Sequence, residues 1–202
     1  LTIVEGQEIA HAARRIKLAE EIEALRDAVA VCQEGIRRMI EQGAPGMSEQ
    51  EIWSLLHQTN IAHGGEWIET RLLSSGGRTN PWYQEAGGRR VAAGDMISLD
   101  SDLVGPHGYS ADISRSWIAG DVRPNAVQRR LYALAHEQVM RNVEAFAPGR
   151  TFYEVADRAF VLPEPFSSYE IPAIAHGIGL CNEFPLVMHE RWAREKGHDG
   201  VI

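Results

Sequence analysis

A group of acidic residues in the middle of the chain could bind a metal ion. Asp100 and Asp102 follow the apolar run Met96–Leu99, Asp112 comes shortly after, and His176 lies further along the chain. Carboxylates at the ends of paired strands, joined by one imidazole, suit a hard or borderline divalent ion such as Mn, Fe or Zn. Two carboxylates held close together repel each other unless a cation or a proton lies between them.

Each of these residues also has a structural explanation. Aspartates near a turn such as Gly105-Pro106 are common turn formers, and for Asp102 alone the two explanations carry equal weight. Asp100 ends an apolar strand, where a buried charge needs a partner, so the structural explanation is weaker there. His176 is as consistent with a satisfied core histidine as with a ligand.

The apolar pattern predicts which elements position these side chains. Alternating spacings of four and three residues, from Leu18 to Met39, indicate one apolar stripe on an amphipathic helix. Two strands flank the turn at Gly105 as a predicted hairpin, across which Asp100 and Asp112 can face each other. The predicted elements are helices over 18–39, 48–63, 125–146 and 151–161, and strands over 67–73, 96–99, 108–117 and 171–175.

A short motif occurs twice. The segments 44–52 and 147–155 both read A-P-G-x-[ST]-x-x-E-[IV], and each follows a long amphipathic helix and opens a shorter one. A helix stop followed by a capping box uses common residues, which is the simpler explanation of so short a match. The shared order of elements around both copies nevertheless favours an internal duplication. Two related halves packed face to face would place a site between them.

Composition narrows the class of protein. The 202 residues are 44% hydrophobic, which is enough for a real core in one good-sized domain or two small ones. A formal charge of −8 argues against nucleic acid or an anionic membrane as partner. Two cysteines exclude a disulfide scaffold and favour a reducing compartment, so we expect a cytoplasmic protein.

Several segments together resemble the creatinase/aminopeptidase family. That resemblance implies the pita-bread α+β fold, in which duplicated helix-and-strand halves surround a curved antiparallel sheet. It also implies one or two metal ions bound by two Asp, one His and two later Glu, with Asp100, Asp112 and His176 as ligands here. The interval between the two aspartates is one residue longer than usual, which makes Asp102 an additional candidate ligand. The matching segments are 15–17, 99–100, 108–115 and 176–180.

The chain departs from the peptidases of that family at two positions. The peptidases carry a histidine in the loop before the first aspartate, where this chain has Thr79–Glu85 with Trp82 and Tyr83. They carry another shortly after H-G-x-G, where this chain has Asn182. Neither Trp nor Asn can shuttle a proton as His does, so both losses argue against ordinary peptide hydrolysis.

The chain looks like the metal-dependent dimethylsulfoniopropionate lyases of the same fold, which share the T-N-P-W loop and the Asp-x-Asp pair. Their small substrate has a carboxylate for the metal and a sulfonium that favours an aromatic lining such as Trp82, Tyr83 or Trp117. A metal-bound carboxylate makes the adjacent C–H more acidic, and a base could trigger β-elimination to dimethyl sulfide and acrylate. The aromatics could equally be packing residues.

The general base is the weak point of the lyase interpretation. The lyases carry an aspartate where this chain has Asn182, which cannot act as a base; Glu183 or Tyr169 could take its place. The first alternative is an Xaa-Pro type metallopeptidase with an altered site. The second is a binding domain that kept the fold and lost the chemistry.

The ends of the sequence suggest a fragment. The chain starts at Leu1 rather than Met and stops on the apolar Gly200-Val201-Ile202. We therefore expect residues 1–202 to be part of one catalytic domain, without the smaller N-terminal domain and the strands that carry the two Glu ligands. Such a fragment should bind metal weakly and be inactive alone. The resemblance implies a homodimer for the full-length protein.

Overall fold

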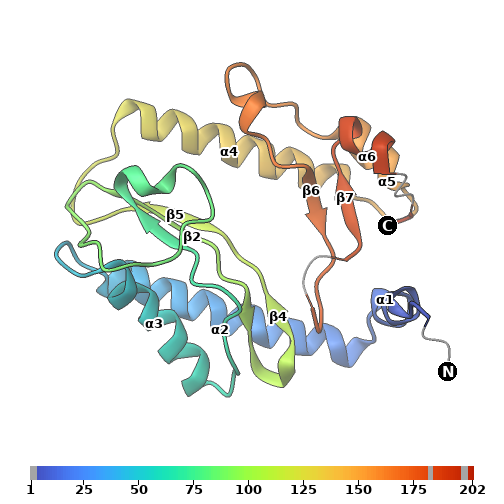
Figure 1. Cartoon of the computed structure of the whole chain (residues 1–202), viewed down its shortest axis with the longest axis horizontal. Helices are drawn as coiled ribbons and strands as arrows, with labels where there is room; N and C mark the ends of the chain where they lie inside the picture. Colours follow the sequence, from blue (N-terminus) through green and yellow to red (C-terminus); the bar gives the residue numbers. More distant parts are fainter. Residues whose placement is uncertain (1–3, 182–183, 197–199) are drawn as a thin grey trace. The chain divides into compact units, whose positions relative to one another are not determined.

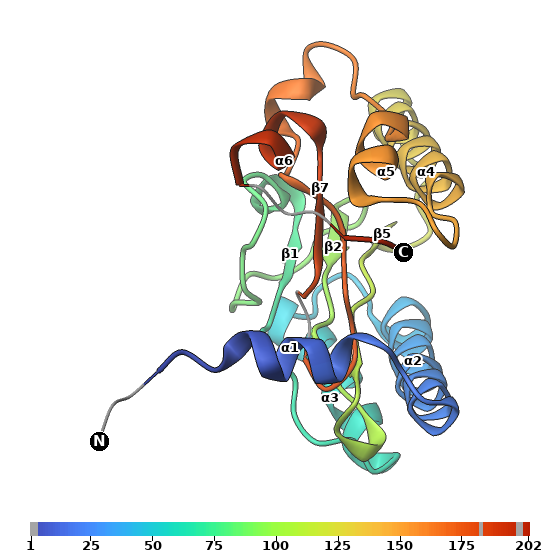
Figure 2. The same cartoon turned by 90° about the vertical axis from the view of Figure 1, so that its right-hand side faces the viewer.

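The computed structural model describes residues 4–181, 184–196 and 200–202 of the chain. The chain divides into two compact units, one of Leu1–Pro124 with Ile178–Asn182 and the other of Asn125–Gly177 with Glu183–Ile202. The helices, labelled in Figures 1 and 2, are α1 (Gln7–Arg15), α2 (Ala19–Gln42), α3 (Glu49–Ala62), α4 (Ala126–Ala145), α5 (Phe152–Arg158) and α6 (Glu190–Lys196). The strands are β1 (Leu73–Ser75), β2 (Met96–Leu99), β3 (Leu103–Val104), β4 (Ser110–Ala111), β5 (Arg115–Ile118), β6 (Ala173–His176) and β7 (Leu186–Met188).

The two long helices of the first unit begin and end where the sequence predicts. The amphipathic α2 stops at Gly43, whose backbone N–H donates to the Met39 carbonyl at 3.0 Å. A capping box opens α3: the Ser48 hydroxyl accepts from the Glu51 N–H at 3.1 Å, and the Glu51 carboxylate accepts from the Ser48 N–H at 2.6 Å. The end of α2 and the start of α3 are therefore fixed by hydrogen bonds of residues that are recognisable in the sequence.

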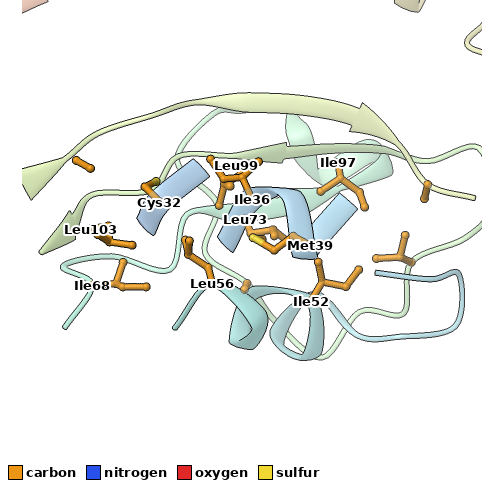
Figure 3. Close-up of a cluster of buried hydrophobic side chains, with 14 of the residues drawn as sticks. Cys32, Ile36, Met39, Ile52, Leu56, Ile68, Leu73, Ile97, Leu99 and Leu103 are labelled. Carbon is orange, nitrogen blue, oxygen red and sulfur yellow. The ribbon is translucent and has the colours of Figure 1, made fainter. Parts of the chain in front are cut away.

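Helices α2 and α3 cover one face of the three-stranded antiparallel sheet β1-β2-β5 (Figure 3). The register places Ser74 opposite Ser98 and Ile97 opposite Trp117. Buried side chains from both layers form the core beneath the sheet, because the apolar stripe of α2 must be removed from water. Those labelled in Figure 3 are Cys32, Ile36, Met39, Ile52, Leu56, Ile68, Leu73, Ile97, Leu99 and Leu103.

The predicted hairpin is wrong in detail, because its strands are interrupted. Strand β2 pairs with β5, while β3 and β4 form a separate two-stranded ladder closer to the turn. Asp102 adopts a positive φ of 35°, which an extended strand cannot contain. The strand expected over 67–73 is also wrong: β1 is Leu73–Ser75, which shares only Leu73 with that range, and Ile68 forms an isolated bridge to Leu103.

The second unit contains α4, α5, α6 and the antiparallel pair β6–β7. Its core cluster consists of Ala145, Phe152, Val155 and Val187. Helix α5 ends at Arg158, earlier than predicted, and the Phe160 N–H donates to the Asn142 side chain at 2.8 Å instead of to a helical carbonyl. Helix α4 buries Ala145 alone among its residues, which contrasts with the many buried residues of α2.

The repeated motif has the same hydrogen bonds in both units. The Gly46 N–H donates to the Val91 carbonyl at 2.8 Å, and in the second unit the Gly149 N–H donates to the Ile202 carbonyl at 3.0 Å. Isolated bridges follow the same pattern, joining Ser48 to Arg90 and Thr151 to Val201. Each copy also carries a complete capping box. Equivalent backbone geometry at equivalent positions supports the internal duplication that the sequence suggested.

Candidate metal centre

Asp100 and Asp112 lie where the β2–β5 pairing gives way to the separate β3–β4 pairing. Asp100 directly follows β2 and Asp112 directly follows β4. Ser101, which is fully buried, joins the two segments: its hydroxyl donates to the Ala111 carbonyl at 3.0 Å and accepts from the Ile113 N–H at 2.9 Å. The serine bridge therefore replaces a strand ladder and brings the carboxylates of Asp100 and Asp112 together.

Hydroxyl groups orient the two carboxylates that follow β2. The Ser114 hydroxyl donates to Asp100 Oδ1 at 2.6 Å, and the Thr70 hydroxyl donates to Asp102 Oδ2 at 2.9 Å. The backbone of both aspartates is held as well: the Asp100 N–H donates to the Leu72 carbonyl at 2.8 Å, and the Asp102 carbonyl accepts from the Glu69 N–H at 3.1 Å. Each carboxylate thus keeps a second oxygen that these hydroxyls do not occupy.

The carboxylates are close enough to perturb one another. Burial raises the pKa of Asp100 to about 6, and the nearby charges of Asp112 and Asp102 add to that rise, while the Ser114 hydroxyl opposes it. A hydrogen bond between the Asp100 and Asp112 side chains contributes in the same direction. Two carboxyl groups this close repel each other when both are charged, and a cation between them would relieve that repulsion. Their oxygen donors fit a hard divalent metal.

Two aromatic side chains lie in the loop that precedes β2. The Trp82 and Tyr83 rings have centroids 5.9 Å apart, and Tyr83 is 61% exposed at a positive φ of 66°. Partial burial raises the pKa of the Tyr83 phenol, and the charges of Asp100, Asp102 and Asp112 raise it further. The phenol therefore lies within the electrostatic reach of all three aspartates.

The remaining candidates lie elsewhere in the chain. Trp117 is on β5 and packs against the core of the first unit. Tyr169 ends a short 3₁₀ helix of the second unit and is 74% exposed. His176 ends β6 in the second unit, with its Nδ1 3.0 Å from the Gly177 carbonyl oxygen. Asn182 and Glu183 lie outside the described residues.

Within the described ranges, no set of three or more His, Cys, Asp or Glu side chains is arranged to enclose a metal ion. Asp100, Asp102 and Asp112 are nevertheless near enough to act on one another as charges, and their charges also raise the pKa of Tyr83. Sequence reasoning missed Ser101, Ser114 and Thr70, which hold those carboxylates. Only Ser114 carries a signal in the sequence, because it lies within the run that resembles the family.

Comparison with known lyases gives matches over nearly the whole chain. The chain is 43% identical to the dimethylsulfoniopropionate lyase DddP of Roseovarius nubinhibens and 40% identical to that of Roseobacter denitrificans. Each match covers 98% of this chain but 45% of the relative. The chain therefore spans about half the length of these relatives.

Peptidases of the same fold are more distant. The Xaa-Pro dipeptidase of Pyrococcus furiosus is 30% identical over 94% of this chain and 52% of its own length. The prolidase structure from Pyrococcus furiosus superimposes with a TM-score of 0.82 at 27% identity, covering 91% of this chain and 55% of that one. The X-Pro aminopeptidase structure from Thermotoga maritima gives a TM-score of 0.81 at 25% identity, covering 91% and 52%.

These matches confirm the pita-bread fold class expected from the sequence. None of the helices in the described part of the chain combines the length and the hydropathy that a bilayer-spanning segment requires. The model of metallopeptidase family M24 matches residues 23–200, and use of a divalent metal follows from that membership. The chain belongs to metallopeptidase family M24, the creatinase/aminopeptidase family.

Proposed function

We propose that this protein is a metal-dependent lyase that cleaves dimethylsulfoniopropionate to dimethyl sulfide and acrylate. One observation carries the proposal: a cluster of three aspartates with an aromatic loop beside it, in a chain that matches two such lyases over 98% of its length. The activity belongs to the whole protein. We propose that residues 1–202 form part of its catalytic domain, since they span 45% of each lyase.

Four residues are proposed to hold the metal: Asp100, Asp102, Asp112 and His176. One or two ions of Mn, Fe or Zn suit this mixture of oxygen and nitrogen donors. When bound, the metal would polarise the substrate carboxylate and make the adjacent C–H more acidic. The hydroxyls of Ser114 and Thr70 keep the aspartate oxygens oriented, because each donates a hydrogen bond to one carboxylate.

Aromatic side chains are proposed to bind the sulfonium end of the substrate. Trp82 and Tyr83 lie on one loop. The charges of Asp100, Asp102 and Asp112, which we call the acidic cluster, raise the pKa of Tyr83. A π-face attracts a cation that has lost its water, so these rings would favour the sulfonium over a neutral group. Trp117 remains a prediction in this role, and its contacts in the structure are with the core.

The elimination needs a base for the proton next to the carboxylate. As that proton leaves, its electron pair forms the C=C bond of acrylate and the C–S bond breaks, releasing dimethyl sulfide. Asn182 cannot accept the proton at neutral pH. We propose Glu183 or, as an alternative, Tyr169 for this step.

Headspace detection of dimethyl sulfide tests the lyase proposal. The full-length, metal-loaded protein is mixed with dimethylsulfoniopropionate, and we expect a signal that Asp100→Ala abolishes. Asp121→Asn, which removes an exposed acid of the same unit, is the matched control and should leave the signal unchanged. Equal signals from the wild type and Asp100→Ala would refute the proposal.

The second candidate is an Xaa-Pro metallopeptidase, favoured by the 30% identity to the Xaa-Pro dipeptidase of Pyrococcus furiosus. Release of amino acids from a panel of Xaa-Pro dipeptides, without dimethyl sulfide from the lyase substrate, would establish it. Metal binding with neither activity would indicate the third alternative, a binding domain. A homodimer, a cytoplasmic location and the absence of a nucleic-acid partner stay predictions.

A further inference from the structure

The carboxylate of Glu49 lies fully buried at the start of α3. Its Oε1 accepts from the Ser75 N–H at 2.9 Å and from the Ser75 hydroxyl at 2.7 Å. Its Oε2 accepts from the Gly87 N–H at 3.0 Å and forms an ion pair with Arg78. All of these partners lie in segment 75–87, so one carboxylate ties both ends of that segment to α3.

The internal repeat shows that the helix start does not require this charge. The residue equivalent to Glu49 in the second copy of the motif is Phe152, which is also buried and belongs to the core of its unit. Both copies keep the same capping box and the same backbone bridge. A buried ion pair is rarely more stabilising than apolar side chains of similar volume. The capping box and the backbone bridge of the motif therefore form without a carboxylate at this position.

Segment 75–87 carries the two aromatic residues of the candidate site. In the sequence, Tyr83 lies between Arg78 and Gly87, the two residues of the segment that bind Glu49 Oε2. Arg78 also donates from Nη2 to the Glu85 carbonyl at 2.9 Å. A tyrosine at a φ of 66° is costly, and such a backbone persists only where surrounding contacts enforce it. Two kinds of contact hold the segment around Tyr83: the buried Glu49 carboxylate, and Arg71, whose carbonyl accepts from the Ala86 N–H at 2.7 Å and whose side chain pairs with Glu85.

We propose that Glu49 is a positioning residue that holds segment 75–87 so that Trp82 and Tyr83 stay beside the acidic cluster. This inference rests on the proposed function in one respect, namely that the acidic cluster and the two aromatics form the substrate site. Glu49 itself acts through Arg78 and the backbone of the segment.

Hydrogen exchange read by mass spectrometry tests the positioning role without metal or substrate. We expect Glu49→Gln to raise the exchange rate of amides in 76–88 about tenfold, because a neutral amide cannot replace a buried charge-assisted pair. Exchange in β2 and α2 should stay at the wild-type rate. Glu51→Gln is the matched control, since it makes the same charge change on the same helix and its carboxylate contacts Ser48 and Arg90 instead.

Exchange that rises equally in β2 and in 76–88, or in neither, would refute the positioning role. If Glu49→Gln fails to fold, Arg78→Gln breaks the same ion pair from its more exposed end and should give the same local increase. An unchanged segment in Arg78→Gln would refute the role equally.

Terbium luminescence tests whether the segment faces the acidic cluster. Direct excitation counts the Tb³⁺ that binds, while excitation of tryptophan reports energy transfer from side chains near the ion. Trp82→Phe measures the share that comes from the segment, and we expect Glu49→Gln to lose most of that share with Tb³⁺ still bound. Full retention of that share would refute the positioning of Trp82. Wild-type protein that binds no Tb³⁺ would refute the proposed metal centre, and the exchange experiment would still decide the role of Glu49.

Discussion

Uncharged hydroxyl groups orient two side chains of the acidic cluster, Asp100 and Asp102. Ser114 donates to Asp100 and Thr70 donates to Asp102, while the buried Ser101 joins the strands beneath them. Because these donors are neutral, they fix the carboxylates without cancelling their charge. The negative potential of the cluster stays available to a cation, which is the arrangement that metal sites use around their ligands.

The buried pair of Glu170 and His189 predicts how the stability of the second unit depends on pH. Burial lowers the pKa of His189; the Glu170 carboxylate, 3.6 Å away, opposes that shift and Arg191 supports it. The folded protein therefore binds fewer protons than the unfolded chain near the unfolded pKa of about 6.5. The stabilisation is complete above that pH and is lost as the pH falls below it.

Urea unfolding at pH 7, 6 and 5 measures this dependence. We expect the free energy of unfolding to fall with pH in the wild type and to fall less in His189→Gln. His136→Gln, at an exposed position on α4, should keep the wild-type dependence. The same slope in His189→Gln and the wild type would contradict the assignment.

At the residue scale, the sequence predicted the acids but not the groups that hold them. Asp100 and Asp112 are recognisable because charged residues beside an apolar strand need a partner. Ser101 and Thr70 carry no such signal, since serine and threonine are common at any exposed position. Their roles depend on which segments the fold brings together, and that depends on contacts distant in the sequence.

At the scale of elements, the first unit depends on a close crossing of α2 and α3. Gly35 lies on α2 where Leu56 of α3 approaches it, and both residues are buried. A Cβ added at Gly35 would lie 2.5 Å from Leu56 Cδ1 and 3.3 Å from its Cα. Leu56 is enclosed by the core, so it has no room to move away.

Gly35→Ala should therefore destabilise the first unit. Overpacking costs about 1–3 kcal/mol, and the better helix propensity of alanine returns up to about 1 kcal/mol. We expect a net loss of about 1 kcal/mol in the free energy of unfolding, measured by urea denaturation. Gly77→Ala, which meets nothing within 4 Å, is the control. A variant at Gly35 as stable as the wild type would show that the helices do not pack this closely.

Elements with local end signals were predictable, and β2 has the bounds expected over 96–99, whereas the strands on either side of it were not predicted correctly. The start of α3 follows from Ser48 and Glu51, and the end of α2 follows from Gly43. The strand expected over 67–73 is instead formed by Leu73–Ser75, because pairing with β2 decides which residues are strand. The predicted hairpin likewise fails at Asp102, whose positive φ interrupts it.

At the scale of the whole chain, one motif used twice organises both units. The copies at 44–52 and 147–155 share their capping boxes and backbone bridges, which the sequence repeat alone could only suggest. The two units differ in the side chains that they place on this shared motif. The first buries a carboxylate at Glu49 where the second buries Phe152, and the first carries the acidic cluster.

The central claim is that the acidic cluster of the first unit binds a divalent metal. Mn²⁺ titrated into this chain, with free Mn²⁺ followed by electron paramagnetic resonance, measures it most directly. We expect weak binding that Asp112→Asn reduces at least about tenfold, because one of the clustered charges is lost. Asp121→Asn, at an exposed position, should bind as the wild type does. Equal Mn²⁺ affinity in Asp112→Asn and the wild type would contradict the claim.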